Sequence, residues 1–148
     1  MPEYSDIYVI SEKRDEKAVR TFLDCFLPER EESADEYEVP QFSDIPEIVY
    51  SKATDLVKYC STYENAEHAI YWRAKDNRKP EHGMVFYLKD GNTIYGLSTD
   101  AGDSSFVNEQ FEKLKQHLGS ELGYIGHEAS PDVEDLNEFK QAIENHKP

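Results

Sequence analysis

Three strand-like segments in the middle of the chain constrain its fold more than any other feature. HAIYWRA (68–74), MVFYLKD (84–90) and TIYGLST (93–99) are rich in the aromatic and β-branched residues that favour strands. Asp90-Gly91-Asn92 separates the last two, and Asp-Gly is a strong hairpin signal because glycine accepts the positive φ of tight turns. A longer polar segment, KDNRKPEHG, joins the first two. We therefore expect an antiparallel three-stranded meander.

Apolar residues at helical spacing predict four helices around this meander. The expected helices run from Arg14 to Leu27, from Ser51 or Thr54 to Tyr63, from Ser104 or Ser105 to Leu118, and onward from Ser130-Pro131. Further short strands are expected at DIYVI (6–10) and GYIG (123–126). The pattern predicts one α+β domain over residues 1–148. In it, two layers are formed by a mainly antiparallel sheet, with the meander at its centre, and by helices packed on one face. Phe111 and Leu114 are expected to be buried against the meander.

The net charge of −15 limits the partners that this chain can attract. Nucleic-acid phosphates and anionic membrane surfaces repel an acidic protein, whereas a basic protein is attracted. The longest apolar run, about Met84 to Leu88, is far shorter than a membrane span, and the acidic MPEYSD start shows no signal peptide. Cys25 and Cys60 are both interpreted as reduced core thiols. These features together predict a cytoplasmic protein that binds neither nucleic acid nor membrane, and they leave the oligomeric state open.

No arrangement of residues in the sequence indicates catalysis. Phosphate-binding, dinucleotide-binding, zinc-protease and serine-hydrolase motifs are all missing from the sequence. His68 and His82 come from neighbouring predicted strands, but a zinc site needs further ligands at suitable spacing. Cys60 with His68 would make a thiol–imidazole pair only if the thiol left the apolar helix face, where it stays protonated. We therefore expect a protein that is not an enzyme and needs no metal or cofactor.

The segment LPEREESADEYEVPQFSDIPEI (27–48) carries eight carboxylates and one base, Arg30. It lacks periodicity, so it is expected to be an acidic loop at about residues 28–47. Its prolines restrict the chain, and its two aromatic residues offer apolar contacts among the charges. We interpret this loop as the surface that binds a basic partner. The residues expected to contact that partner are Glu31, Glu32, Asp35, Glu36, Tyr37, Glu38, Phe42 and Asp44.

The meander offers an alternative docking surface. Tyr71, Trp72, Phe86, Tyr87 and Tyr95 crowd it, and because strand side chains alternate between faces, some of these aromatic rings could form an exposed row.

HAIYWRAKDNRKPEHGMVFYLKDGNTIYGLST (68–99) resembles the strand–turn–strand core of bacterial immunity proteins, which neutralise the toxins of polymorphic or contact-dependent systems. The resemblance covers this part of the chain and carries over no binding residues. It implies a stoichiometric inhibitor of a cognate toxin such as a nuclease. An α+β domain that binds a small molecule, or acts on one, in a pocket between sheet and helices remains the alternative, and a purely structural subunit is a third interpretation.

Overall fold

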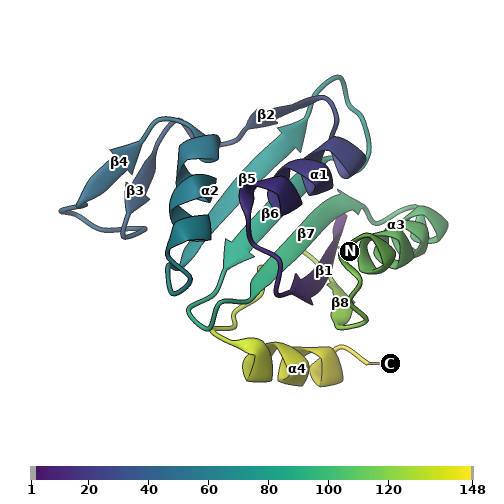
Figure 1. Ribbon diagram of the computed structural model, residues 1–148. Helices are drawn as coiled ribbons and strands as arrows, with labels where there is room; N and C mark the ends of the chain where they lie inside the picture. Colours follow the sequence, from purple (N-terminus) through teal and green to yellow (C-terminus); the bar gives the residue numbers. More distant parts are fainter. Residues whose placement is uncertain (1–2, 148) are drawn as a thin grey trace.

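The computed structural model describes residues 3–147 and confirms an α+β fold with a mainly antiparallel sheet (Figure 1). The main sheet has the strand order β2-β5-β6-β7-β1-β8, and each neighbouring pair is antiparallel. Its strands are β1 (Tyr4–Ser11), β2 (Arg30–Glu32), β5 (His68–Ala74), β6 (His82–Tyr87), β7 (Thr93–Asp100) and β8 (Gly123–Gly126). A separate two-stranded sheet consists of β3 (Tyr37–Val39) and β4 (Ile48–Tyr50). The helices are α1 (Glu16–Phe26), α2 (Ala53–Thr62), α3 (Ser104–Leu118) and α4 (Leu136–Asn145).

The hairpin between β6 and β7 forms where the Asp-Gly pair predicts it. Gly91 has a φ of 90°, and the Leu88 and Asn92 backbones close the turn with an N–H···O bond of 3.0 Å. β5, β6 and β7 therefore pair in chain order. β1 then adds beside β7, so that the N-terminal strand lies inside the sheet rather than at its edge.

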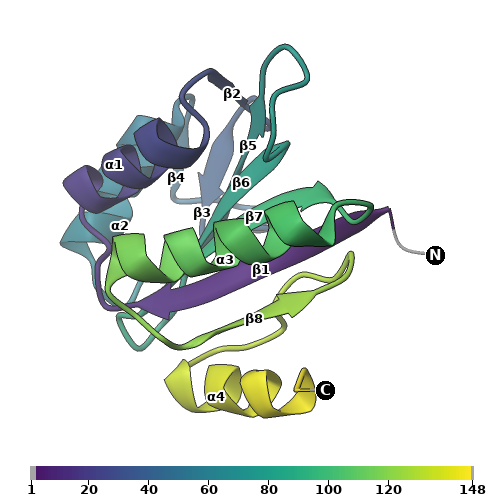
Figure 2. The same ribbon diagram turned by 90° about the vertical axis from the view of Figure 1, so that its right-hand side faces the viewer.

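The helices cover both faces of the sheet, so the expectation that they all pack on one face is wrong. Ile7 and Val9 of β1 belong to the core beneath α1, α2 and α3. Tyr8 and Ile10, which point the opposite way, belong to a second core that contains Phe139 of α4. Figure 2 shows α4 on the far side of the sheet from α1 and α2. The run DIYVI carries the signal for this arrangement, because its apolar residues do not alternate with polar ones and both faces of the strand are buried.

Three helix predictions can be compared with the structure at their ends. The third helix is confirmed: α3 spans Ser104 to Leu118 and stops at Gly119, which has a φ of 65°. The last helix begins at Leu136 with Asp135 as its cap, not at Ser130-Pro131. The second begins at Ala53, and neither Ser51 nor Thr54 caps it.

No helix within residues 3–147 is long and apolar enough to cross a membrane.

Two side chains that were predicted to lie in the core, those of Phe111 and Cys25, are not fully buried. Phe111 is only partly buried, its helix lies over β1 and β8 rather than over the meander, and its ring occupies the space that a side chain at Gly123 would need. Leu114 is fully buried, as expected, although its helix lies over β1 and β8 and not over the meander. Cys25 is exposed, because the buried stripe of α1 runs past it through Phe22 and Phe26. The expectation of two core thiols therefore holds only for Cys60.

Candidate protein-binding surface

The acidic stretch is not the irregular loop expected at residues 28–47. Its first part forms β2, which pairs with the outer edge of β5. Its next part forms β3, which pairs with β4 just beyond the stretch. A three-residue strand of charged side chains such as β2 has no readable periodicity, so its pairing with β5 is set by backbone hydrogen bonds.

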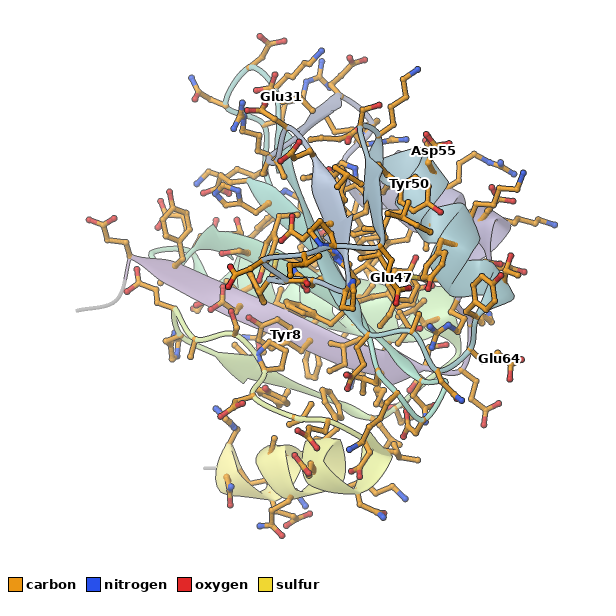
Figure 3. The ribbon with its side chains drawn as sticks, turned by 90° about the vertical axis from the view of Figure 1, so that its left-hand side faces the viewer. Tyr8, Glu31, Glu47, Tyr50, Asp55 and Glu64 are labelled. Atoms are coloured by element: carbon orange, nitrogen blue, oxygen red, sulfur yellow. The ribbon has the colours of Figure 1, made fainter. Side chains whose placement is uncertain are left out.

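We call residues 33–50 the arm, which consists of β3, β4, their connection and the segment that leads into them. Figure 1 shows β3 and β4 at one end of the molecule, beyond α2, and Figure 3 views the molecule from that end. The arm carries five carboxylates and no Lys, Arg or His. This segment therefore presents charge of one sign only.

The inner strand of the arm is fastened to the body of the protein. Tyr37 and Val39 belong to the main core, and the Tyr37 ring packs edge-on against His68 at 6.4 Å. His68 Nε2 lies 2.9 Å from the Glu38 carbonyl oxygen. Burial, followed by the hydrogen bond to Glu32, raises the pKa of the Tyr37 hydroxyl well above its ordinary value. These contacts fix the base of the arm.

Gln41 fastens the arm at a second point. Its side-chain oxygen accepts the Ala69 N–H at 3.0 Å, and its side-chain nitrogen donates to the Ala69 carbonyl at 3.4 Å. The carboxamide thus takes the place of a neighbouring strand at the free end of the β5 edge. An edge occupied in this way cannot template pairing with another chain.

The tip of the arm exposes apolar side chains. Phe42 is 85% exposed and Ile45 is 87% exposed, and Val49 on the outer strand is 50% exposed. Phe42 also adopts a φ of 63°, which is strained for an aromatic residue, and its N–H donates to Glu38 Oε1 at 3.0 Å. Exposed apolar side chains grouped among charges mark interaction sites. The sequence drew attention to Phe42 but not to Ile45, which lies between an aspartate and a proline.

The carboxylates of the stretch fall into two groups. Glu31 pairs with Arg73, and the hydrogen bond from this guanidinium lowers the pKa of the Glu31 carboxyl. Glu32 Oε1 accepts the Tyr37 hydroxyl and the Ala53 N–H, each at 2.8 Å. The Phe42 N–H lowers the pKa of the Glu38 carboxyl. The other five form no side-chain hydrogen bond or ion pair with any residue in the described range 3–147. These five are Glu29, which precedes β2, and Asp35, Glu36, Asp44 and Glu47.

The structure therefore separates the residues expected to bind a partner. Asp35, Glu36, Phe42 and Asp44 are exposed and accessible. Glu32 connects β2 to the start of α2, and Tyr37 is only 3% exposed, so the Tyr37 ring is not an exposed contact residue. The pattern Tyr-Glu-Val carried this information, because alternation places Tyr37 and Val39 on one face of a strand.

The aromatic side chains of the meander do not form the exposed row considered as the alternative docking surface. Among the five, only Tyr71 is exposed. The others are buried in the two cores, where Tyr95 packs on Phe22 at 5.0 Å and Phe86 packs on Tyr8 at 6.1 Å. The arm is thus the larger exposed apolar surface.

The candidate chemical groups lie apart from one another. His68 points into the main core, whereas His82 is on the other face of the sheet beside Tyr4, with ring centroids 5.9 Å apart. Burial raises the pKa of the Cys60 thiol to about 12, so this sulfur is protonated at neutral pH. Within residues 3–147, no three His, Cys, Asp or Glu side chains are grouped to hold a metal ion.

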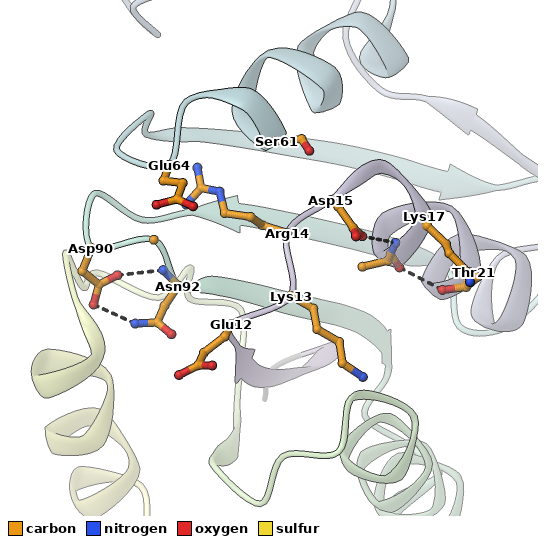
Figure 4. A pocket seen from close by; sticks show the side chains of 12 residues that line it. Glu12, Lys13, Arg14, Asp15, Lys17, Thr21, Ser61, Glu64, Asp90 and Asn92 are labelled. Atoms are coloured by element: carbon orange, nitrogen blue, oxygen red, sulfur yellow. Dashed lines mark hydrogen bonds between the residues drawn. The ribbon is translucent and has the colours of Figure 1, made fainter.

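A hollow of about 720 Å³ lies where the β1–α1, α2–β5 and β6–β7 connections meet (Figure 4). Its polar groups hold these loops together. Arg14 donates to the carbonyl oxygens of Cys60, Tyr63, Ala66 and Leu88 at 3.0 to 3.4 Å. Asp15 caps α1, and Asp90 accepts from the backbone and side chain of Asn92. This hollow therefore reads as a structural junction.

A smaller hollow of about 300 Å³ lies between α1, α2 and the β2–β5 edge. Val19, Leu23, Val57 and Trp72 supply its apolar lining, and charged side chains of both signs stand at its rim. Its volume is at the lower limit for small-molecule sites, which is about 300 Å³.

The chain matches no protein-family model, no curated protein and no solved structure.

Proposed function

We propose that this protein is a non-enzymatic binding protein that captures a basic protein through the arm. The observation that carries the proposal is the combination at one tip of exposed apolar side chains with unpaired carboxylates and no base. Carboxylates speed the encounter with a cationic surface, and apolar side chains such as Phe42 and Ile45 slow dissociation once water is excluded. The fastened inner strand lowers the ordering cost of binding.

The more specific form of the proposal is toxin neutralisation. The strand–turn–strand core at residues 68–99 resembles that of bacterial immunity proteins, and an acidic inhibitor suits a toxin whose active cleft binds phosphates. In this form the partner is a basic toxin such as a nuclease, bound in a one-to-one complex that blocks its cleft. The site of action is the cytoplasm.

The test measures binding kinetics with a basic partner captured from the organism that encodes the chain, at low and at physiological ionic strength. The first variant replaces Glu36 with Gln and Asp44 with Asn, because neither side chain has a partner in the fold. Its control, Glu109→Gln with Asp132→Asn, changes the net charge equally but lies outside the arm. The arm variant should associate several-fold more slowly at low salt, and the control should associate nearly as fast as wild type.

Phe42→Ser tests the apolar contribution. It should weaken the complex by more than about 1 kcal/mol, chiefly through faster dissociation, if Phe42 fills a pocket on the partner. Its melting temperature should match that of wild type because the ring makes few contacts in the free protein. The proposal is wrong if both arm variants, Glu36→Gln with Asp44→Asn and Phe42→Ser, associate with and dissociate from the partner at the wild-type rates.

The alternative, a small-molecule-binding or enzymatic domain, is favoured by one observation, the 300 Å³ hollow between the sheet and the helices. Val57→Trp would fill that hollow from α2. If this filled variant still binds the basic partner as wild type does, the hollow is not part of the protein-binding function.

A further inference from the structure

Three tyrosines form a row that continues from the arm onto α2. Tyr50 is the last residue of β4, Tyr59 lies on α2, and Tyr63 follows the C-terminal end of that helix. Their ring centroids are 6.1 Å apart between Tyr50 and Tyr59 and 4.8 Å apart between Tyr59 and Tyr63. Tyr50 and Tyr59 are partly buried against the main core, whereas Tyr63 is 57% exposed.

Exposed carboxylates flank this row. Figure 3 shows Glu47, Asp55 and Glu64 on the same side of the molecule as Tyr50. None of the three forms an ion pair within the described residues 3–147. Glu47 is close enough to Tyr59 to contribute, after burial and the neighbouring residues Tyr63 and Cys60, to the raised pKa of its hydroxyl. Residues 33–67 hold eight carboxylates against two lysines, Lys52 and Lys58, so the surface is anionic overall.

A row of half-exposed aromatic rings beside free carboxylates suits one type of side chain above others. The planar guanidinium of arginine stacks on an aromatic face and binds a carboxylate through its edge at the same time. Lysine has a compact, strongly hydrated charge that gains less from stacking. An apolar partner would leave the flanking carboxylates desolvated and unpaired, which is unfavourable. The chemistry of this surface therefore distinguishes cations from one another.

We infer that the tyrosine row is a second part of the docking surface, which takes arginine side chains of the same basic protein that the arm binds. This inference rests on the proposed function, because the row is continuous with the arm through Tyr50. In this arrangement the tip of the arm holds the partner by apolar contacts, and the row on α2 selects arginine over lysine.

The test uses short oligo-arginine and oligo-lysine peptides of equal length, with binding to the intact protein followed by calorimetry at low salt. Wild type should bind oligo-arginine about two- to five-fold more tightly than oligo-lysine, the preference expected of stacking at an exposed site. Tyr63→Leu should remove that preference and leave oligo-lysine binding nearly unchanged. Tyr63→Phe keeps the aromatic face and should retain the preference. Tyr71→Leu is the matched control, because Tyr71 is exposed on the other face of the sheet.

The outcomes separate this inference from the proposed function. The inference that the tyrosine row binds arginine is wrong if wild type shows no preference for oligo-arginine, or if the Tyr63→Leu variant keeps that preference. If the tyrosine row shows no arginine preference but Glu36→Gln with Asp44→Asn weakens binding of both peptides, the arm remains the docking surface. If Tyr63→Leu removes the preference while the arm variant binds both peptides as wild type does, the row stands and the arm does not bind cations.

Discussion

Glu32 should contribute substantially to stability although it lies in the most acidic part of the chain. Its Oε1 atom accepts two hydrogen bonds, from the Tyr37 hydroxyl and from the Ala53 N–H at the start of α2. Through one oxygen it therefore joins the base of the arm, the β2 edge strand and a helix that has no side-chain cap of its own. Substituting alanine leaves both donors without this acceptor.

The expected loss follows from these two contacts. Hydrogen bonds to a charged group contribute about 1.5–3 kcal/mol each, and a helix cap contributes about 1 kcal/mol. Glu32 is half-buried, so water replaces part of what is lost. We expect Glu32→Ala to lower the free energy of unfolding by about 2–3 kcal/mol, which corresponds to roughly 5–10 °C in melting temperature. Glu32→Gln keeps an acceptor oxygen and loses only the attraction of charge to the helix N-terminus, about 0.3–1 kcal/mol.

Urea unfolding is the appropriate assay. The slope of the free energy of unfolding against urea concentration should be the same for wild type and variant, because a different slope would mean that the unfolding transition itself has changed. Glu36→Ala is the control, since that exposed side chain has no partner in the fold and its loss should change stability by no more than about 0.5 kcal/mol. In a double-mutant cycle, Tyr37→Phe should cost about 1 kcal/mol in wild type and less in the Glu32→Ala protein. If Glu32→Ala and Glu36→Ala unfold at the same urea concentration, the structural role assigned to Glu32 is wrong.

Two further predictions concern the body of the protein. Arg14→Lys should lower the free energy of unfolding by about 2–4 kcal/mol despite keeping the charge, because one ammonium group cannot reach all the carbonyl oxygens that Arg14 binds, in the last turn of α2, the α2–β5 connection and the β6–β7 connection; chemical denaturation that shows no loss would contradict this. At neutral pH, a thiol reagent should modify Cys25 rapidly and Cys60 only on unfolding, since burial raises the pKa of the Cys60 thiol to about 12. A fast-reacting thiol that persists in Cys25→Ser would show that the Cys60 environment opens.

The sequence predicts the elements whose side chains carry a strong local pattern. The helix from Ser104 to Leu118 and the Asp90-Gly91 hairpin are such cases, because an apolar stripe with a glycine stop and a turn dipeptide are both local signals. The side of the sheet on which α4 lies is not determined by a local sequence signal. Periodicity identifies the apolar face of a helix, but only the opposite-facing residues of β1 determine which core that face joins.

A comparison of two residues of the candidate surface shows the same limit of prediction from the sequence. Tyr37 and Phe42 are aromatic residues of one acidic segment, and composition treats them alike. Tyr37 is inside because a three-residue strand turns it toward His68 and the main core. Phe42 is outside because a left-handed backbone, bonded to Glu38, directs it away from the body. Such a backbone conformation is set by the contacts of the folded arm, which no composition or spacing rule contains.

The division of the carboxylates decides how the arm must be probed. Glu31 and Glu32 lie in β2, just before the arm, where each is held by a partner, whereas Asp35, Glu36, Asp44 and Glu47 of the arm have none within the described residues 3–147. A variant that neutralised the whole stretch would weaken folding and encounter together, and a slow association rate would then have two causes. Restricting substitutions to the unpaired carboxylates keeps the folded population constant, because exposed charges contribute little to stability. Any remaining change in association rate then reports the electrostatic attraction between the arm and its partner alone.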